Sequence, residues 1–281
     1  MSLEGKVCLI TGAAGGLGSA TARRLSADGV RLVLVDLDAD RLAALAKELP
    51  SPVVVHPGDV ASEADVDAAV AAGVAEFGRV DLYHLNAGIP GPLTRLPDLA
   101  VEDFDRVIAI NLRGVFLGVR AAFRQYEVQA RAGAPGGAIV VTASIASLRA
   151  GDDLIAYHAS KHGVVGVVKS AAVFGGPIGV RVNAVAPGIV PTALFAGSGS
   201  GPGAGDDMVR RASTTPLRRA GTGEEIASVV AFLLGDGAAY MTGEVVSVDG
   251  GAAAVSTVRP AGGAGAWDPR PRDVQLHPEL G

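Results

Sequence analysis

The stretch "YHASKHG" places a phenol and an amine four residues apart, at Tyr157 and Lys161. On a helix, this spacing puts both side chains on one face. A phenol normally titrates near a pKa of ~10, and a neighbouring ammonium lowers that pKa by stabilising the phenolate. Such a phenol can serve as the general acid or base for a hydroxyl–carbonyl pair. Taken alone, the pair is more often a surface feature than a catalytic one, so the rest of the chain must decide.

A glycine cluster, "TGAAGGLG" (11–18), follows directly after the apolar run "KVCLI". Its spacing puts Gly12, Gly16 and Gly18 at the junction between a predicted strand and a predicted helix. Glycine there lets the chain turn tightly and lets a phosphate approach the backbone, while the free N–H groups of the helix hold the phosphate. The cluster therefore predicts a pyrophosphate-binding loop.

An acidic residue, Asp36, ends the second predicted strand, "RLVLVD" (31–36). A carboxylate at this place accepts hydrogen bonds from the two ribose hydroxyls and repels a 2′-phosphate. Neither Lys nor Arg stands at position 37, 13 or 14. The sequence therefore predicts NAD as the cofactor and disfavours NADP.

Short β-branched runs alternate with longer segments of helical periodicity. Strands are predicted at 7–10, 31–36, 52–56, 80–85, 138–143, 180–185 and 244–249, and helices at 17–28, 40–48, 62–77, 101–130, 157–174 and 223–234. Nearly continuous apolar strands suit a parallel sheet that is covered on both faces. The alternation predicts an α/β fold with one doubly wound parallel sheet and helices on both faces.

Residues 1–251 are predicted to form one catalytic domain, which contains a flexible Gly-rich substrate loop at 196–207. A Gly- and Pro-rich tail at 252–281 follows, and it contains the single tryptophan, Trp267. That tail is either disordered or docks on its own or a neighbouring subunit.

Composition narrows the class of function. The net charge is −5 and no basic run occurs, so nucleic acid is not an expected partner. Apolar stretches are short, so no membrane span is expected, and the N-terminus lacks the pattern of a signal peptide. The single cysteine, Cys8, lies in an apolar run and fits a reducing cytoplasm. The five histidines are scattered without ligand spacing, so we expect no metal site.

The whole set of motifs closely resembles the short-chain dehydrogenase/reductase family, in its common form of about this length. The resemblance runs from residue 3 to residue 251 and rests on these segments in this order: "TGAAGGLG" (11–18), Asp36, "GDV" (58–60), "NAG" (86–88), "IAINLRG" (108–114), "ASIAS" (143–147), "YHASK" (157–161), "RVNAVAPGIVPT" (181–192) and "SVDGG" (247–251). It implies a Rossmann-type fold and oxidoreductase activity.

The resemblance implies four catalytic residues. Tyr157 would be the acid/base, and Ser144 would hydrogen-bond and polarise the substrate oxygen. Lys161 would lower the pKa of the tyrosine and hold the nicotinamide ribose. Asn111 would keep a proton-relay water behind the lysine. Together they predict hydride transfer between a nicotinamide and a carbon that bears a hydroxyl or carbonyl group.

Cofactor and substrate contacts follow from the same resemblance. The dinucleotide would contact Gly12, Ala14, Gly15, Gly16, Leu17, Gly18, Asp36, Leu37, Asp59, Val60, Asn86, Ala87, Gly88, Tyr157, Lys161, Pro187, Gly188, Ile189, Val190 and Thr192. The substrate would contact Ser144, Ile145, Leu154, Tyr157 and Phe195, within walls drawn from 89–96, 145–155 and 189–216. These walls are mostly small or aliphatic, which predicts a largely apolar substrate. Asp152 and Asp153 are either solvated loop residues or contacts for a polar group of the substrate.

Three departures from the family pattern stand out. Leu85 replaces a usual asparagine before "NAG", and the neighbouring His84 is expected to be a packed side chain. The segment 124–137 is longer than usual and is expected to extend a surface loop. The helix 163–176 is apolar nearly all round, and Val173 replaces a usual glutamate. Because such a helix must be covered, we expect a homodimer or homotetramer.

The predicted function is therefore the interconversion of a secondary alcohol and a ketone on a small, mainly apolar molecule, with NAD. An NADP-dependent carbonyl reductase is the alternative within the same class. A non-catalytic regulator that senses the dinucleotide, or a partner subunit that only completes an oligomer, is disfavoured because the chain keeps all four catalytic residue types.

Overall fold

The computed structural model describes residues 3–151, 154–192, 212–213, 215–254 and 279. Several features singled out from the sequence lie outside these residues: Asp152, Asp153, Phe195, the loop 196–207, Met208, and the tail from 255 onward with Trp267, apart from residue 279.

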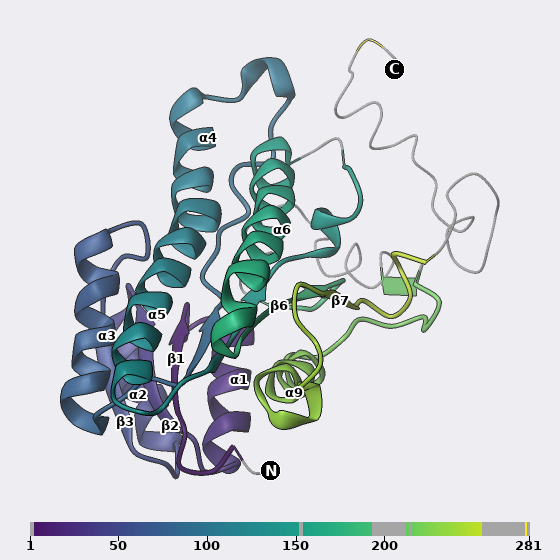
Figure 1. Cartoon of the computed structure of the whole chain (residues 1–281). Helices are drawn as coiled ribbons and strands as arrows, with labels where there is room; N and C mark the ends of the chain where they lie inside the picture. Colours follow the sequence, from purple (N-terminus) through teal and green to yellow (C-terminus); the bar gives the residue numbers. More distant parts are fainter. Residues whose placement is uncertain (1–2, 152–153, 193–211, 214, 255–278, 280–281) are drawn as a thin grey trace.

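Within the described residues, seven parallel strands form one sheet in the order β3-β2-β1-β4-β5-β6-β7 (Figure 1). The strands are β1 Val7–Thr11, β2 Arg31–Asp36, β3 Val53–Pro57, β4 Leu82–Leu85, β5 Gly137–Thr142, β6 Val180–Pro187 and β7 Val245–Val248. This is the predicted doubly wound sheet, so the predicted fold class is confirmed. The strand order reverses between β1 and β4, which is where ligands bind in sheets of this kind.

Two layers of helices cover the sheet. The helices α1 Gly16–Ala27, α2 Ala39–Glu48 and α9 Gly223–Leu234 pack on one face, where Leu25, Leu42 and Ile226 join the core. The helices α3 Glu63–Phe77, α5 Gly114–Arg131 and α6 Ile155–Gly175 cover the other face. Because both faces are covered, β1 and β4 are buried at every position.

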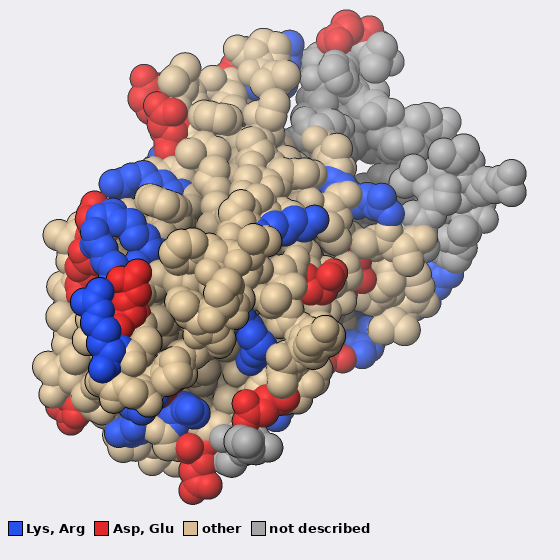
Figure 2. Space-filling view, in the orientation of Figure 1, with Lys and Arg blue, Asp and Glu red and all other residues tan. Residues whose placement is uncertain are grey.

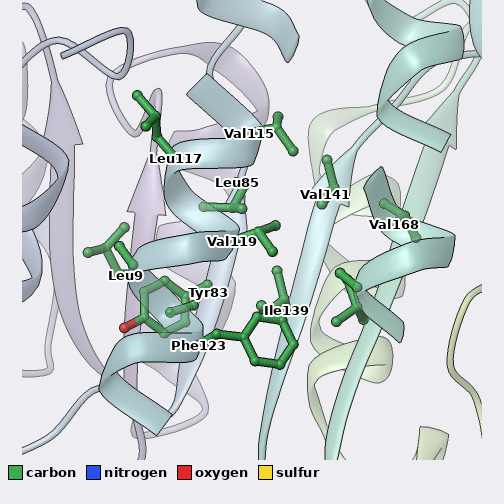
Figure 3. Packing of buried hydrophobic residues seen from close by; sticks show 14 of the residues in the cluster. Leu9, Tyr83, Leu85, Val115, Leu117, Val119, Phe123, Ile139, Val141 and Val168 are labelled. Atoms are coloured by element: carbon green, nitrogen blue, oxygen red, sulfur yellow. The ribbon is translucent and has the colours of Figure 1, made fainter. Parts of the chain in front are cut away.

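The core under α5 and α6 explains one departure from the family pattern. In Figure 3, Leu85 and Tyr83 of β4 lie with Ile139 and Val141 of β5 beneath the side chains of α5. A Cβ atom added at Gly118 of α5 would lie 2.6 Å from a methyl carbon of Leu85. Leu85 therefore fills a close contact between β4 and α5.

One long helix was expected over 101–130, but the structure divides it. Helix α4 (Val101–Ile108) continues through a π turn, Ala109–Arg113, into α5. Single π turns within helices are rare, and those that occur are often found at functional sites. The segment 124–137, which was expected to extend a surface loop, is divided: its first part is the end of α5, up to Arg131, and residues 132–136 connect α5 to β5.

Among the described residues, no helix is both long enough and apolar enough to cross a membrane.

Candidate active site

A cleft of about 630 Å³ opens at the carboxyl ends of the strands, at the point where the strand order reverses. Its walls come from the segments that follow β1, β2, β3, β4, β5 and β6, and from the first turns of α6. One end is bordered by Asp36 and Asp59, and the other by Ser144, Leu154 and Tyr157.

The glycine loop that follows β1 forms the floor of the cleft. Gly12 has a φ of +63°, and a Cβ atom there would lie 2.8 Å from the Ala87 backbone. A Cβ atom at Gly18 would lie 2.1 Å from the Gly12 carbonyl oxygen. Helix α1 begins directly after the loop, and none of the described side chains caps it. Its first N–H groups are therefore available to an anion in the cleft.

Asp36 closes the far end of the cleft. Its Oδ2 accepts a hydrogen bond of 3.0 Å from the backbone N–H of Ala14, and its Oδ1 accepts one of 3.3 Å from that of Asp38. The guanidinium of Arg41 donates to the Ala14 carbonyl at 2.6 Å. The carboxylate is thus tied to the glycine loop while it lines the cleft.

Tyr157 and Ser144 meet at the near end. The Ser144 and Tyr157 side chains are hydrogen-bonded to each other, and both are buried. Ser144 begins a short 3₁₀ turn, Ile145–Ser147, in which its Oγ accepts from the Ala146 N–H at 3.1 Å and the Ser147 Oγ accepts from the Ser144 N–H at 3.2 Å. These bonds fix the serine against the tyrosine.

Lys161 lies behind Tyr157 on the same face of α6, as the four-residue spacing predicts. Its Nζ is 5.7 Å from the centre of the tyrosine ring and donates to the Thr142 carbonyl at 2.7 Å. Burial lowers the pKa of Lys161 to about 8.

The pKa of Tyr157 itself is raised, because burial disfavours the phenolate more than the hydrogen bond from Ser144 favours it. The sequence-based interpretation had Lys161 lowering this pKa. In the protein without cofactor, burial is the larger effect and the net direction is the opposite.

Asn111 sits in the π turn and is fully buried. Its Oδ1 accepts from the Ile89 N–H at 2.8 Å, and its Nδ2 donates to the Ile89 carbonyl at 2.8 Å and to Ser160 Oγ at 3.1 Å. It therefore joins the segment after β4 to the helix that carries the tyrosine and lysine.

A buried polar chain runs from the sheet to the glycine loop. The Thr142 hydroxyl donates to Asn86 Oδ1 at 3.0 Å, and Asn86 Nδ2 donates to the carbonyls of Thr11 and Gly12, each at 3.2 Å. His84 Nε2 lies 2.9 Å from Thr142 Oγ1. Since the threonine hydrogen goes to Asn86, His84 donates through Nε2, and its Nδ1 has no partner among the described residues. Burial lowers the pKa of His84 to about 3, so the ring is neutral.

Comparison with known proteins places this geometry in a family. Residues 12–253 match the family model described as enoyl-(acyl carrier protein) reductase. Levodione reductase of Leifsonia aquatica is 39% identical over 260 residues, which cover 89% of this chain and 94% of that protein. D-threitol dehydrogenase of Mycolicibacterium smegmatis is 42% identical over 252 residues, which cover 89% and 93%. The chain belongs to the short-chain dehydrogenase/reductase family.

Solved structures of this short-chain dehydrogenase/reductase family superpose on nearly the whole described fold. The crystal structure of levodione reductase matches with a TM-score of 0.86 at 38% identity and covers 90% of this chain and 99% of that chain. The 3-ketoacyl-(acyl-carrier-protein) reductase of Brucella melitensis, solved in complex with NADH, matches with a TM-score of 0.82 at 33% identity and covers 90% and 100%. The protein is thus a short-chain alcohol dehydrogenase/ketoreductase by family.

Most cofactor contacts that the family resemblance implied come together on the cleft wall. The lining includes Gly12, Gly15, Gly16, Leu17, Asp36, Leu37, Asp59, Val60, Asn86, Ala87, Gly88, Tyr157, Lys161, Pro187, Gly188, Ile189, Val190 and Thr192. Ala14 and Gly18 do not line it. Ala14 instead holds Asp36 through its N–H, and Gly18 lets α1 pack against the glycine loop.

The short-chain dehydrogenase/reductase resemblance also named residues around the reacting groups. Ser144, Ile145 and Leu154 line the cleft, as do the aliphatic side chains of Ile89 and Ile189. Asn111 does not line it and acts from behind, through Ile89 and Ser160. Phe195 lies outside the described residues. No cluster that could hold a metal ion occurs in the part of the chain that the structure describes.

Three polar residues on the cleft wall were given no role of their own from the sequence: Thr142, Arg149 within the predicted wall 145–155, and His158 within the motif 157–161. Thr142 carried a usable signal, since a hydroxyl at the end of an otherwise apolar strand must find a partner. Arg149 and His158 gave none, because a single charged or polar residue between Ser144 and the first turns of α6 looks like an ordinary loop or helix residue.

Proposed function

We propose that the protein is an NAD-dependent dehydrogenase that interconverts a secondary alcohol and a ketone, with Tyr157 as the acid/base. One observation carries the proposal: the hydrogen-bonded pair Ser144–Tyr157 faces the same cleft as the glycine loop and Asp36. A hydroxyl pair suited to a carbinol oxygen and a carboxylate suited to a ribose thus lie at opposite ends of one cavity.

The residues present fit a dinucleotide. A side chain at Gly12 would collide with Ala87, and one at Gly16 with Thr192, so both positions require glycine. Without side chains, the loop lets a ligand approach its backbone closely. The open start of α1 suits the pyrophosphate, and Asp36 suits the adenosine ribose. When bound, the nicotinamide would accept or supply the hydride. The Brucella melitensis relative solved with NADH supports the choice of NAD over NADP.

The chain's own residues would handle the proton and the substrate oxygen. In oxidation, the Tyr157 phenolate takes the proton of the substrate hydroxyl, while the Ser144 hydroxyl donates to the same oxygen. The alcohol would give up this proton to Tyr157 and a hydride to the bound nicotinamide, and it would become a ketone. Lys161, behind the ring, favours the phenolate when it carries its charge.

The cleft wall favours a largely apolar substrate body, because Ile89, Ile145, Leu154 and Ile189 surround the Ser144–Tyr157 pair. The relatives include both a reductase and a dehydrogenase by name, levodione reductase and D-threitol dehydrogenase, so either direction is open to the family. Binding of NAD favours oxidation in a cell, where the NAD pool is mostly oxidised.

Cofactor choice gives the test. The ratio of kcat/KM values for NAD and NADP is measured with a panel of secondary alcohols, for the wild type and for Asp36→Ala. We expect a strong NAD preference that shrinks in the variant, mainly through a higher KM for NAD. Asp40→Ala, which removes an exposed carboxylate from the first turn of α2, is the matched control. An NADP preference in the wild type would contradict the proposal and support the carbonyl-reductase alternative.

We also propose that the protein works as a homodimer or homotetramer in the cytoplasm. The side chains of Val173 and Phe174 on α6 are 81% and 63% exposed. In Figure 2, the surface over α5 and α6 is mostly uncharged. A second copy of the chain would cover this face. The buried free thiol of Cys8 is compatible with a reducing compartment.

A further inference from the structure

Arg149 is a cation that the proposed mechanism does not use. It is an exposed residue that lines the cleft five positions after Ser144, and its backbone N–H donates to the Ile145 carbonyl at 3.0 Å. It takes part in none of the ion pairs found among the described residues. An arginine that faces a ligand cavity without a carboxylate partner has donors to offer a ligand.

The Arg149 side chain is held by the turn that follows β7. Its Nη2 donates to the Ala253 carbonyl, in the turn that follows β7. Asp249 fixes that turn, because its Oδ1 accepts from the Gly251 N–H at 2.9 Å and its Oδ2 from the Ala253 N–H at 2.7 Å. A guanidinium carries five N–H donors, and this contact uses one of its ends.

The charges on the cleft wall are divided between its ends. The carboxylates that line it, Asp36 and Asp59, follow β2 and β3, whereas Arg149 follows β5. Three strand spacings separate β2 from β5, about 14 Å in all. That distance exceeds the Debye length of about 8 Å at physiological salt, so the carboxylates act weakly on a ligand beside Arg149.

Among the described residues, the groups around Arg149 make no ion pair with it: the Asp249 carboxylate, in the turn that Arg149 contacts, is bound by the Gly251 and Ala253 N–H groups. The Lys161 ammonium is buried and bound to the Thr142 carbonyl. His158 donates through Nδ1 to the Leu154 carbonyl at 2.9 Å. The end of the cleft that holds Ser144 and Tyr157 is therefore apolar on most of its wall and positive at Arg149.

From this arrangement we infer that the natural substrate is a hydroxy or keto acid anion, whose carboxylate or other oxyanion binds Arg149 while its carbinol lies at Ser144 and Tyr157. The inference rests on the proposed dehydrogenase function and narrows its substrate class. A planar guanidinium pairs with a carboxylate through two parallel hydrogen bonds, which makes it selective for such a group. The anion would sit beyond an apolar segment of the substrate that contacts Ile145 and Leu154.

The test compares an acid with an uncharged isostere. Purified full-length protein, with NAD at neutral pH, receives 4-hydroxycyclohexanecarboxylate or its amide, and shorter and longer hydroxy acids with their amides. We expect at least one acid to exceed its amide in kcat/KM by about tenfold or more, as a charge-assisted pair provides. In Arg149→Met this acid-to-amide ratio should fall toward one, and Arg149→Lys should keep part of it.

Arg23→Met is the matched control, since Arg23 is an exposed arginine of α1 that pairs with Glu48 and does not line the cleft. Its acid-to-amide ratio should equal that of the wild type. Equal kcat/KM values for acids and amides in the wild type, or an acid preference that persists in Arg149→Met, would overturn the inference. So would an Arg149→Met effect on the KM for NAD alone, which would assign the arginine to the cofactor. The proposed function is tested separately by the turnover of the amides, which should be lost in Tyr157→Phe.

Discussion

Burial shifts the pKa values of two side chains of the proposed catalytic group, Tyr157 and Lys161. Burial raises the pKa of Tyr157 and lowers that of Lys161 to about 8. Both shifts favour the neutral form of the side chain, because burial makes the charged form unfavourable. A charged group bound nearby can offset this free-energy cost.

We therefore expect Lys161→Met to abolish activity and to increase the free energy of unfolding. In the unfolded chain the lysine titrates near a pKa of about 10.4, so a folded pKa of about 8 costs roughly 3 kcal/mol below pH 8. Loss of the hydrogen bond to the Thr142 carbonyl takes back about 1 kcal/mol. We expect the variant to be inactive and to unfold at a higher temperature than the wild type at pH 7.

The sign of the pH dependence follows from the lowered pKa. Between pH 8 and about 10.4 the folded wild type loses the proton that the unfolded chain keeps, so wild-type stability rises relative to the variant. Thermal unfolding of both proteins across this range measures the effect. A gap in Tm that is constant with pH, or a less stable variant at pH 7, would contradict the account.

His84 provides a test at a position remote from the substrate. His84→Leu removes the donor to Thr142 and with it the support of Asn86 and the glycine loop. We expect the Kd for NAD to rise about fivefold, as one lost hydrogen bond of ~1 kcal/mol implies. The free energy of unfolding should not fall, because the unpartnered Nδ1 leaves with the ring.

His84→Gln is the matched variant, since its amide keeps an N–H donor. It should bind NAD more tightly than His84→Leu in calorimetric titration. Equal NAD affinity in the wild type and both variants would show that the polar chain does not reach the cofactor site.

The residues that touch the cleft were more predictable than those that support it. Tyr157, Lys161 and Asp36 could be predicted because their chemistry depends on spacing or on a strand end, which the sequence displays. The partners of His84 and Thr142 could not, since these residues are 58 positions apart and meet only when β4 pairs with β5. The position of the Arg149 side chain could not be predicted either, because it depends on a hydrogen bond to the turn after β7.

At the scale of elements, the strand-to-helix junction after β1 depends on glycine for two separate reasons. Gly12 needs a positive φ, whereas Gly18 needs room against the Gly12 carbonyl. The pattern of glycines predicted a loop for a phosphate, and the structure shows that one of them serves packing rather than ligand approach.

Two glycine-to-alanine substitutions within helices separate these roles. In Gly166→Ala, on α6, the new Cβ meets no atom within 4 Å, so we expect a gain of about 0.5–1 kcal/mol in the free energy of unfolding. Gly18→Ala, on α1, drives its Cβ into the Gly12 carbonyl and should lower stability and weaken NAD binding.

Denaturant unfolding and NAD titration of both variants provide the measurement. Because both substitutions raise helix propensity by the same amount, opposite signs of the stability change isolate the packing at Gly18. A stabilised Gly18→Ala protein with normal NAD affinity would refute the packing role.

The π turn at Ala109–Arg113 marks a limit of prediction at this scale. Apolar periodicity over 101–130 correctly indicated helix, but one extra residue in a turn leaves that periodicity almost unchanged. The turn places Asn111 against Ile89 and Ser160, contacts that require the fold of α6 and the segment after β4.

For the whole molecule, the described residues leave apolar side chains of α6 exposed, and we proposed that a second copy of the chain covers them. We expect a dimer or tetramer by light scattering at micromolar concentration. Phe174→Glu should shift it toward smaller species, because it sets a charge on an apolar side chain that is 63% exposed in the single chain. A monomeric wild type would contradict this expectation.

The parallel sheet and both helical layers could be predicted from patterns in the sequence, because nearly continuous apolar strands suit a sheet that is covered on both faces. The strand order was not predicted and comes from the structure. The identity of the substrate could not be predicted, since the walls of the cleft come from segments after six strands that only the folded chain brings together.

Reduction of NAD by the purified protein, followed by absorbance with a panel of secondary alcohols and hydroxy acids, tests the central claim most directly. The account predicts formation of NADH that falls at least about a hundredfold in Tyr157→Phe, while the Kd for NAD stays the same. Turnover that survives in Tyr157→Phe, or tight NAD binding with no turnover of any substrate in the wild type, would contradict it.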